Sequence, residues 1–336
     1  MTGPLTVLIA PDSFKGSQTS VQVARALADG WARARPDDTI LLCPLADGGE
    51  GTLEAVAAAG GWEWREAPAT DPLGRVITAR WLRSTDGTRA FIEMAESSGL
   101  SRVAPGERAA IHATSAGLGD VLGAVAGSGV RDVIVGIGGS ATTDGGFGMM
   151  TALSMDFSPR PDGDAPPRGI PDVLDEVFLH DLKADLRKVG LSVASDVTNP
   201  LLGPTGAAAV YGPQKGATLE QVAELDRRLT RFADLLERAS QRPVPVRDLP
   251  GAGAAGGVGF ALLAIQDRFA SFALRPGVEL VMEATDFDVR LAGASRHHGR
   301  GSDRCPDDVR QDRARRRAAS GRRGHPVHRG RGRCGT

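Results

Sequence analysis

The sequence predicts an α/β protein in which parallel strands alternate with helices. Several apolar runs rich in Val, Ile and Leu each lead into a loop of Gly, Ser and Asp, and a helical pattern follows. The clearest case is residues 133–150, where a β-branched run passes into Gly-Gly-Ser and one carboxylate. The chain has 336 residues, of which 41% are hydrophobic and only 4% aromatic, so it can fill a large core and suits an α/β enzyme better than a β-sandwich.

The first two strands are predicted at residues 5–10 and 39–45. Between them, residues 20–35 place Val23, Ala24, Leu27 and Trp31 at helical spacing, with Ser20 or Thr19 as the N-cap. A second helix is predicted directly after residues 46–52, ADGGEGT. Because parallel strands end at one edge of a sheet, the loops 11–17 and 46–52 are expected to lie together.

These two loops carry candidate catalytic residues. Lys15 can neutralise a phosphate or a carboxylate, and an aspartate can accept a hydroxyl proton or bind a metal. The alternative is that Asp12 and Ser13 cap a turn and that Lys15 is solvated. Asp47 and Glu50 lie on the second loop.

The middle of the chain is less regular. Residues 76–81 and 89–94 are predicted strands around the turn 84–87, and Glu93 ends the second one. A glutamate after a buried run is either part of a site or reaches its rim, and we favour the site. The loops 193–200, 212–216 and 250–257 each follow an apolar run; any one of them is compatible with a structural turn, but together they suggest one cleft.

The loop after residue 136 is a candidate phosphate site. The backbone N–H groups of a Gly-Gly-Ser loop can approach an anion closely, and Asp144 is near enough in sequence to hold Mg²⁺ against the same phosphates. The alternative is a tight strand-to-helix turn capped by Thr142 or Thr143. The segment matches neither a Walker A loop nor GxGxxG, so no standard signature decides between them.

Other classes of protein fit poorly. No apolar run is long enough to span a bilayer and the N-terminus does not resemble a signal peptide, so a cytoplasmic protein without a membrane partner is expected. Cys43, Cys305 and Cys334 lack metal-ligand spacing.

Residues 295–336 differ from the rest of the chain. They contain 13 Arg, no Lys and 4 Asp, and no Leu, Ile, Met, Phe, Trp or Tyr, so they are expected to be disordered. One interpretation is a basic tail that binds nucleic acid. The favoured one is a frameshift near Ala294, because residues 296–312 can be back-translated into codons that, read one base later, encode VITGEGRIDAQTMYGK.

Eight motifs together give the chain a resemblance to the bacterial glycerate kinases. They occur in that family's order between Leu5 and about Gly293: APDSFKGS from Ala10, ADGGEGT from Ala46, DPLGR from Asp71, EMA from Glu93, GIGGSATTDGG from Gly136, DVTNPLLG from Asp196, GPQKG from Gly212 and PGAGAAGG from Pro250. The family also carries a TGEGRxD segment, which this sequence lacks in frame and the alternative reading supplies.

The resemblance implies Mg²⁺-dependent transfer of the γ-phosphoryl group of ATP to D-glycerate, giving a phosphoglycerate and ADP. It implies a flavodoxin-like parallel-sheet domain from residues 1–75 and 266–294, incomplete here, with a second α/β domain inserted at 76–265. Small molecules rather than nucleic acid are then the partners. A nucleic-acid-binding protein and a non-catalytic nucleotide-binding protein remain alternatives, and neither the phosphorylated hydroxyl, the range of hydroxy acids nor the oligomeric state follows from the sequence.

Phosphoryl transfer needs mainly positioning and charge neutralisation, so glycine loops, lysines and acids are a sufficient set. The roles assigned on this basis are catalytic for Asp12, Lys15, Asp47 and Lys215; nucleotide or phosphate binding for Gly138, Gly139, Ser140, Thr142 and Gly256; substrate binding for Ser13, Glu50 and Glu93; and metal binding for Asp144 and Asp196.

Overall fold

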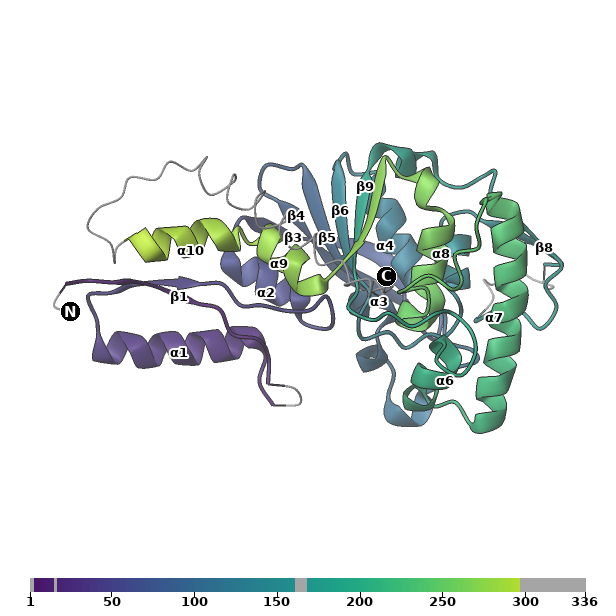
Figure 1. Cartoon of the computed structure of the whole chain (residues 1–336), viewed down its shortest axis with the longest axis horizontal. Coiled ribbons are helices and arrows are strands. Elements are labelled where there is room, and N and C mark those ends of the chain that lie inside the picture. Colours follow the sequence, from purple (N-terminus) through teal and green to yellow (C-terminus); the bar gives the residue numbers. More distant parts are fainter. Residues whose placement is uncertain (1–2, 15–16, 161–167, 297–336) are drawn as a thin grey trace, which may run out of the picture.

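A computed structural model describes residues 3–14, 17–160 and 168–296, which form a mixed α/β architecture around two main sheets (Figure 1). The larger sheet has the order β10-β9-β6-β5-β4-β3, in which β10, β9, β6 and β5 are parallel and the last two strands are antiparallel. Its strands are β3 Trp62–Thr70, β4 Val76–Ser84, β5 Arg89–Glu93, β6 Asp132–Gly136, β9 Gly190–Ala194 and β10 Ser271–Arg275.

The four parallel strands end in register. Glu93 of β5 pairs with Gly136 of β6, Gly136 pairs with Ala194 of β9, and Ala194 pairs with Arg275 of β10. Their carboxyl ends therefore form one straight edge, which is where an open α/β sheet collects ligands.

Helices cover both faces of this sheet (Figure 1). One face packs on α2 and α9 through a cluster that includes Leu53, Val56 and Leu280. The other face packs on a larger core that holds α4, α5, α7 and α8. The helices are α2 Thr52–Ala59, α3 Ala95–Ser98, α4 Ala116–Ala126, α5 Phe147–Ala152, α6 Ala207–Tyr211, α7 Leu219–Ser240, α8 Val258–Ala264 and α9 Gly277–Ala284.

Short elements complete this part of the molecule. An antiparallel pair, β7 Asp156–Ser158 and β8 Glu176–Phe178, lies outside the two main sheets. Six 3₁₀ turns join the longer elements among residues 3–14, 17–160 and 168–296: Leu100–Arg102, Pro105–Glu107, Ala184–Lys188, Pro213–Lys215, Ala254–Gly257 and Gln266–Arg268.

The smaller sheet pairs β1 (Thr6–Ile9) with β2 (Thr39–Leu42) in parallel, as predicted. Helix α1 (Ser20–Ala34) joins the two strands, and α10 (Phe287–Arg296) contacts β1 (Figure 1). Thr19 caps α1 in a capping box with Gln22, which confirms Thr19 rather than Ser20 as the N-cap.

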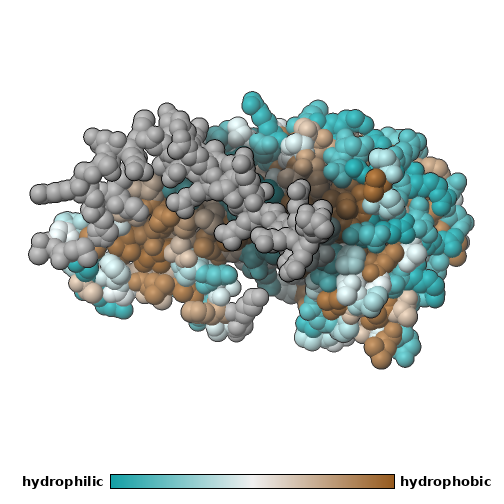
Figure 2. All heavy atoms as spheres, viewed as in Figure 1, coloured by the Kyte–Doolittle hydropathy of each residue, from teal (hydrophilic) through white to brown (hydrophobic). Residues whose placement is uncertain are grey.

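The apolar stripe predicted on α1 is only half buried. Val23 and Ala24 are buried, whereas Leu27 is 53% exposed and Trp31 is 38% exposed. Figure 2 shows hydrophobic side chains at the surface of this part of the molecule. Within the described part of the chain the smaller sheet has two strands, and two strands cannot cover the whole apolar face of a 15-residue helix.

Strand pairing differs from the predicted domain boundaries. β3 was not predicted, yet it pairs along its whole length with β4, and β10 pairs with β9. By sheet membership, therefore, residues 62–70 and 271–275 belong with the segment predicted as the inserted domain. The rest of the segment 266–294 forms α9 and α10, beside β1 and α2. The predicted disorder of the Arg-rich tail concerns residues outside the described part, apart from the end of α10.

Candidate active site

Two adjoining pockets lie along the carboxyl edge of the larger sheet. The first, which we call the Asp12 pocket, has a volume of about 880 Å³ and is lined by the loops after β1, β2 and β5. The second, the Ser140 pocket, has a volume of about 390 Å³ and is lined by the loops after β6 and β9 and by residues 211–215 and 254–255. Asp47 and Gly49 line both pockets, so the loop after β2 separates them.

Close backbone contacts hold the Asp47 loop against the sheet edge. A Cβ atom on Gly136 would lie 2.4 Å from the carbonyl oxygen of Gly48, and one on Gly277 would lie 1.7 Å from the carbonyl oxygen of Asp47. Neither position has room for a side chain. The absence of side chains at these glycines therefore lets the loop sit directly over β6 and at the N-terminus of α9.

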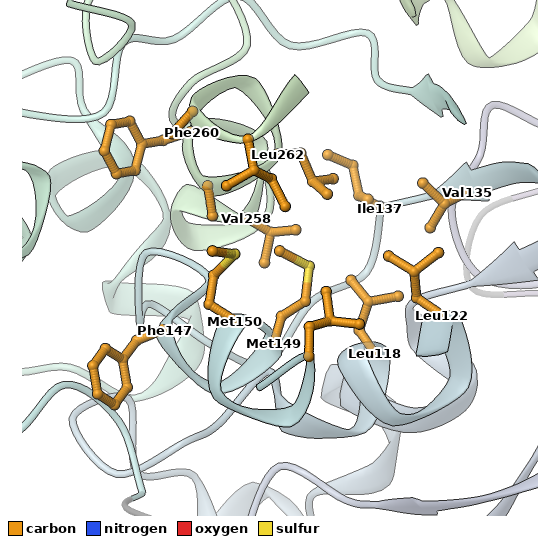
Figure 3. Close-up of a cluster of buried hydrophobic side chains, with 14 of the residues drawn as sticks. Leu118, Leu122, Val135, Ile137, Phe147, Met149, Met150, Val258, Phe260 and Leu262 are labelled. Atoms are coloured by element: carbon orange, nitrogen blue, oxygen red, sulfur yellow. The ribbon is translucent and has the colours of Figure 1, made fainter. Parts of the chain in front are cut away.

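A hydrophobic cluster supports the glycine loop after β6. Figure 3 shows Val135 and Ile137 packed with side chains of α4, α5 and α8, and these residues are buried. Gly139 has a φ of +71°, which favours glycine. The backbone N–H groups of Gly139 and Ser140 donate no hydrogen bond to any of the described residues. Both residues line the Ser140 pocket, as does Gly138, so two unpaired donors are available to an anion there.

Lys215 lies behind this loop. Its ammonium group donates to the Ser140 hydroxyl oxygen at 2.9 Å and to the Thr142 carbonyl oxygen at 2.5 Å, and the residue is 2% exposed. Burial lowers the pKa of Lys215 to about 7, although the negative charge of Asp144 acts in the opposite direction.

Asp144 is buried beneath the loop rather than facing a pocket. Its two carboxylate oxygens accept four hydrogen bonds, from the backbone N–H groups of Ser115, Gly146 and Gly148 and from the Ser115 hydroxyl. Burial raises the pKa of this carboxyl group, and those donors lower it. This geometry favours a structural role for Asp144, at the start of α5, over the metal binding predicted from the sequence.

Two predicted phosphate-binding residues also lie outside the pocket walls. Thr142 is fully buried, and its hydroxyl, like that of Thr143, has no partner in the described part of the chain. The predicted threonine cap of α5 is therefore wrong, because Gly146 occupies the N-cap position. Gly256 packs on the loop instead: its carbonyl oxygen accepts from Gly145, and a Cβ on it would lie 1.9 Å from the Thr142 carbonyl oxygen.

The predicted substrate residues line the Asp12 pocket. Ser13 and Glu50 are exposed there, whereas Glu93 is 3% exposed and accepts from the backbone N–H groups of Gly51 and Leu53, each at 3.0 Å. Burial raises the pKa of Glu93 to about 8, against the lowering effect of these two donors.

Sequence reasoning missed two arginines in the Asp12 pocket. Arg80 donates to Glu54 at 2.7 Å and to Glu96 at 2.5 Å, and Arg102 donates to Glu96 at 3.0 Å. Arg80 lies on β4, between β5 and β3, and nothing in the sequence of this strand distinguishes it as a pocket residue. In the Ser140 pocket, Tyr211 was also missed, although it is the only tyrosine of the chain and directly precedes the GPQKG motif.

Asp196, which the sequence predicts as a metal ligand, lines the Ser140 pocket. It is exposed in the Ser140 pocket, and one of its carboxylate oxygens accepts from the backbone N–H of Gly277 at 3.1 Å. Its other oxygen has no partner in the described residues. Across residues 3–14, 17–160 and 168–296, no three His, Cys, Asp or Glu side chains are grouped closely enough to hold a metal by themselves. One carboxylate beside phosphate oxygens suffices for Mg²⁺, so the residues present fit this ion.

The structure thus brings most of the predicted site together. The Asp12 pocket is lined by Asp12, Ser13, Glu50 and Glu93. The Ser140 pocket is lined by Gly138, Gly139, Ser140, Asp196 and Lys215, and Asp47 lines both pockets. Lys15 lies outside the described residues. In the described ranges, no helix combines the length and apolarity needed to cross a membrane.

Comparison with known proteins identifies the family. The model of the glycerate kinase family matches residues 7–296. This chain belongs to the glycerate kinase family. Within it, the chain is 41% identical over 288 residues to a glycerate 2-kinase of Escherichia coli K12, covering 85% of this chain and 74% of that one. It is also 41% identical to a glycerate kinase of Bacillus subtilis 168, covering 84% and 73%.

A solved structure of the same family extends the likeness to the fold. The crystal structure of a putative glycerate kinase 2 from Salmonella typhimurium LT2 matches with a TM-score of 0.76 and 42% identity, covering 87% of this chain and 77% of that one. The glycerate kinase resemblance inferred from the motifs is therefore confirmed, and so is an α/β fold dominated by parallel strands. Family membership also identifies the chain as an ATP-dependent kinase.

Proposed function

We propose that this protein transfers the γ-phosphoryl group of ATP to a hydroxyl group of D-glycerate. The observation that supports this most directly is how the two pockets divide the predicted residues. Those expected to bind the acceptor line the Asp12 pocket, and the loop expected to bind phosphate lines the Ser140 pocket. Asp47 lies at the boundary, where the acceptor hydroxyl would meet the γ-phosphate.

In this arrangement the protein acts mainly by positioning. The unpaired N–H groups of Gly139 and Ser140 bind phosphate oxygens, and Asp47 accepts a hydrogen bond from the attacking hydroxyl and orients it. One Asp47 oxygen is already fixed by the backbone N–H of Gly49, at 3.0 Å, which sets the direction of the carboxylate. Asp12 and Lys15 remain proposed catalytic residues on the neighbouring loop.

Mg²⁺ would be held by Asp196 together with phosphate oxygens. When bound, the ion would neutralise charge that develops on those oxygens. Asp196 is oriented for this by the N-terminus of α9, through Gly277. We also propose a cytoplasmic location, because the phosphoryl donor is ATP.

We further propose that a frameshift near Ala294 limits the activity of this chain. Two observations support it: the family match ends at residue 296, and apolar side chains of α1 and α10, such as Leu27 and Val289, are exposed beside the two-stranded sheet. A strand such as the VIT segment of the alternative frame could pair with that sheet and cover them.

The test measures glycerate-dependent ADP release by two purified proteins, this chain and one restored to the alternative frame after Ala294. We expect little activity from the first and clear activity from the second. Equal rates would reject the frameshift proposal. ATP binding without glycerate-dependent ADP release in both would reject the kinase function in favour of a non-catalytic nucleotide-binding protein.

Asp47→Asn in the restored chain tests the site itself. We expect kcat to fall by roughly a hundredfold or more, because a side chain that accepts the proton of the reacting hydroxyl typically contributes that much to the rate. Asp37→Asn is the control and should leave kcat unchanged. Asp37 is an exposed aspartate between α1 and β2 and lines neither pocket.

A further inference from the structure

The contact between Lys215 and Ser140 constrains the direction of the Ser140 hydroxyl. The Lys215 side-chain nitrogen is 2.9 Å from the Ser140 hydroxyl oxygen and 2.5 Å from the Thr142 carbonyl oxygen. An ammonium group has three N–H donors and no lone pair, so it can only donate. The Ser140 oxygen is therefore the acceptor of this hydrogen bond, and the Ser140 proton must point elsewhere.

That proton has no acceptor in the described part of the protein. Ser140 donates no hydrogen bond there, and its side chain lines the Ser140 pocket. The backbone N–H groups of Gly139 and Ser140, which line the same pocket, also lack an acceptor among the residues that the structure describes. A Ser140 hydroxyl that points into the pocket would bring the donors in this wall to three.

We propose that Lys215 is a positioning residue that fixes the Ser140 hydroxyl as a hydrogen-bond donor to a phosphate group in the Ser140 pocket. The inference rests on the proposed function, which places the nucleotide phosphates there. It assigns Lys215 an indirect role, in place of the direct charge neutralisation predicted from the sequence. At least two of its three donors point to protein oxygens, and the residue is 2% exposed.

The alternative, direct contact between Lys215 and phosphate, predicts a different pattern of variants. If Lys215 acts through Ser140, then removing either side chain removes the same interaction, and the double variant loses no more than the worse single variant. If each contacts phosphate independently, the losses multiply. The double-mutant cycle therefore separates the two.

The experiment measures ADP affinity by calorimetry for the frame-restored chain, which serves as the wild type, and for its Ser140→Ala, Lys215→Met and double variants. We expect each single change to weaken ADP binding roughly tenfold or more, with the double variant no weaker than the worse single one. Lys188→Met, at an exposed lysine paired with Asp185, is the control and should bind as wild type. Multiplicative losses would overturn the inference alone, whereas a frame-restored chain that binds no ADP would overturn the proposed function and the inference with it.

A pH series gives a second readout that does not need Lys215→Met to fold. Once Lys215 is neutral, its lone pair can accept the Ser140 proton and the hydroxyl can turn inward. The ratio of ADP affinities, wild type over Ser140→Ala, should therefore fall towards one as the pH rises through about 7. Titration of ADP itself cancels in this ratio.

Other charged or titratable groups surround Lys215. These are Asp144 beneath the loop, Arg108 across a small apolar void, and Asp47, Asp196 and Tyr211 around the pocket. They are present in both proteins, so a ratio that does not change with pH would also overturn the inference.

Discussion

Glu93 links the carboxyl edge of the sheet to the loop that carries Asp47 and Glu50. Its carboxylate accepts from the N–H groups of Gly51 and Leu53, at the start of α2, and only 3% of the residue is exposed. The change we consider is Glu93→Gln, which keeps the size of the side chain and one carbonyl acceptor but cannot ionise.

The magnitude follows from the raised pKa of Glu93. This carboxyl group has a pKa of about 8 in the folded protein against an ordinary value of 4.5. Between these values the folded state binds more protons than the unfolded state, so the free energy of unfolding falls as the pH rises. It falls by about 1.4 kcal/mol per pH unit, or roughly 5 kcal/mol over the whole interval.

Glu93→Gln removes this dependence of the free energy of unfolding on pH, because glutamine does not ionise. Measured from about pH 5.5 to about pH 7.5, the free energy of unfolding of the wild type relative to the variant should fall by roughly 3 kcal/mol. Urea denaturation followed by the fluorescence of the buried Trp62 and Trp81 gives both curves. Other groups titrate alike in both proteins and cancel in the difference.

Glu66→Gln, at an exposed position of β3, is the matched control and should follow the wild type at every pH. Parallel pH profiles for wild type and Glu93→Gln would refute the reasoning, since they would show that Glu93 is ionised throughout in both folded and unfolded states. A difference that grows in the opposite direction would refute it as well.

Two further predictions concern buried contacts of the site. Asp144→Asn should lower the free energy of unfolding by about 1–3 kcal/mol. Backbone N–H groups donate to both carboxylate oxygens of Asp144, so the NH₂ group of asparagine would have to face one of these donors. Thermal denaturation measures the loss of stability. An unchanged melting temperature would contradict this prediction. Gly277→Ala should displace the Asp47 loop, because the new Cβ would lie 1.7 Å from the Asp47 carbonyl oxygen. We expect glycerate-dependent ADP release by the frame-restored chain to fall at least tenfold. Gly293→Ala, where a Cβ meets nothing within 4 Å, is the control and should leave the rate of ADP release unchanged.

The position of the site could be predicted from the sequence because it depends on a rule of topology. Parallel strands separated by helices place their C-terminal loops at one edge, so Asp12 and Asp47, which follow β1 and β2, were expected to lie together. Ser140 follows β6 of the larger sheet, so its position beside them depends on how the two sheets pack. The structure places all three in two adjoining pockets. The helix cap at Thr19 was predictable for a similar reason, since capping depends on a few neighbouring residues.

The roles of individual loop residues could not be predicted in the same way. Ser140 and Asp144 are four residues apart in one small-residue motif, yet Ser140 lines a pocket and Asp144 is buried under α5. The difference arises from the turn at Gly145 and Gly146, both of which have positive φ, and from donors supplied by Ser115, 29 residues earlier. Sequence spacing carries no information about such a distant partner.

The roles of the glycines in these motifs could not be predicted from the sequence either. Read locally, Gly136, Gly138 and Gly256 are available to bind phosphate, since a bare backbone can approach an anion. In the structure, Gly136 and Gly256 instead make room for other backbone: Gly136 for the carbonyl group of Gly48, and Gly256 for that of Thr142. Gly138 also packs closely on the Asp47 loop, since its N–H donates to the Gly48 carbonyl oxygen, although the residue lines the Ser140 pocket. A glycine-rich motif in this fold therefore reflects the close packing of one loop on another. The donors that we propose bind an anion, the N–H groups of Gly139 and Ser140, are ones that this packing leaves without a partner among the described residues.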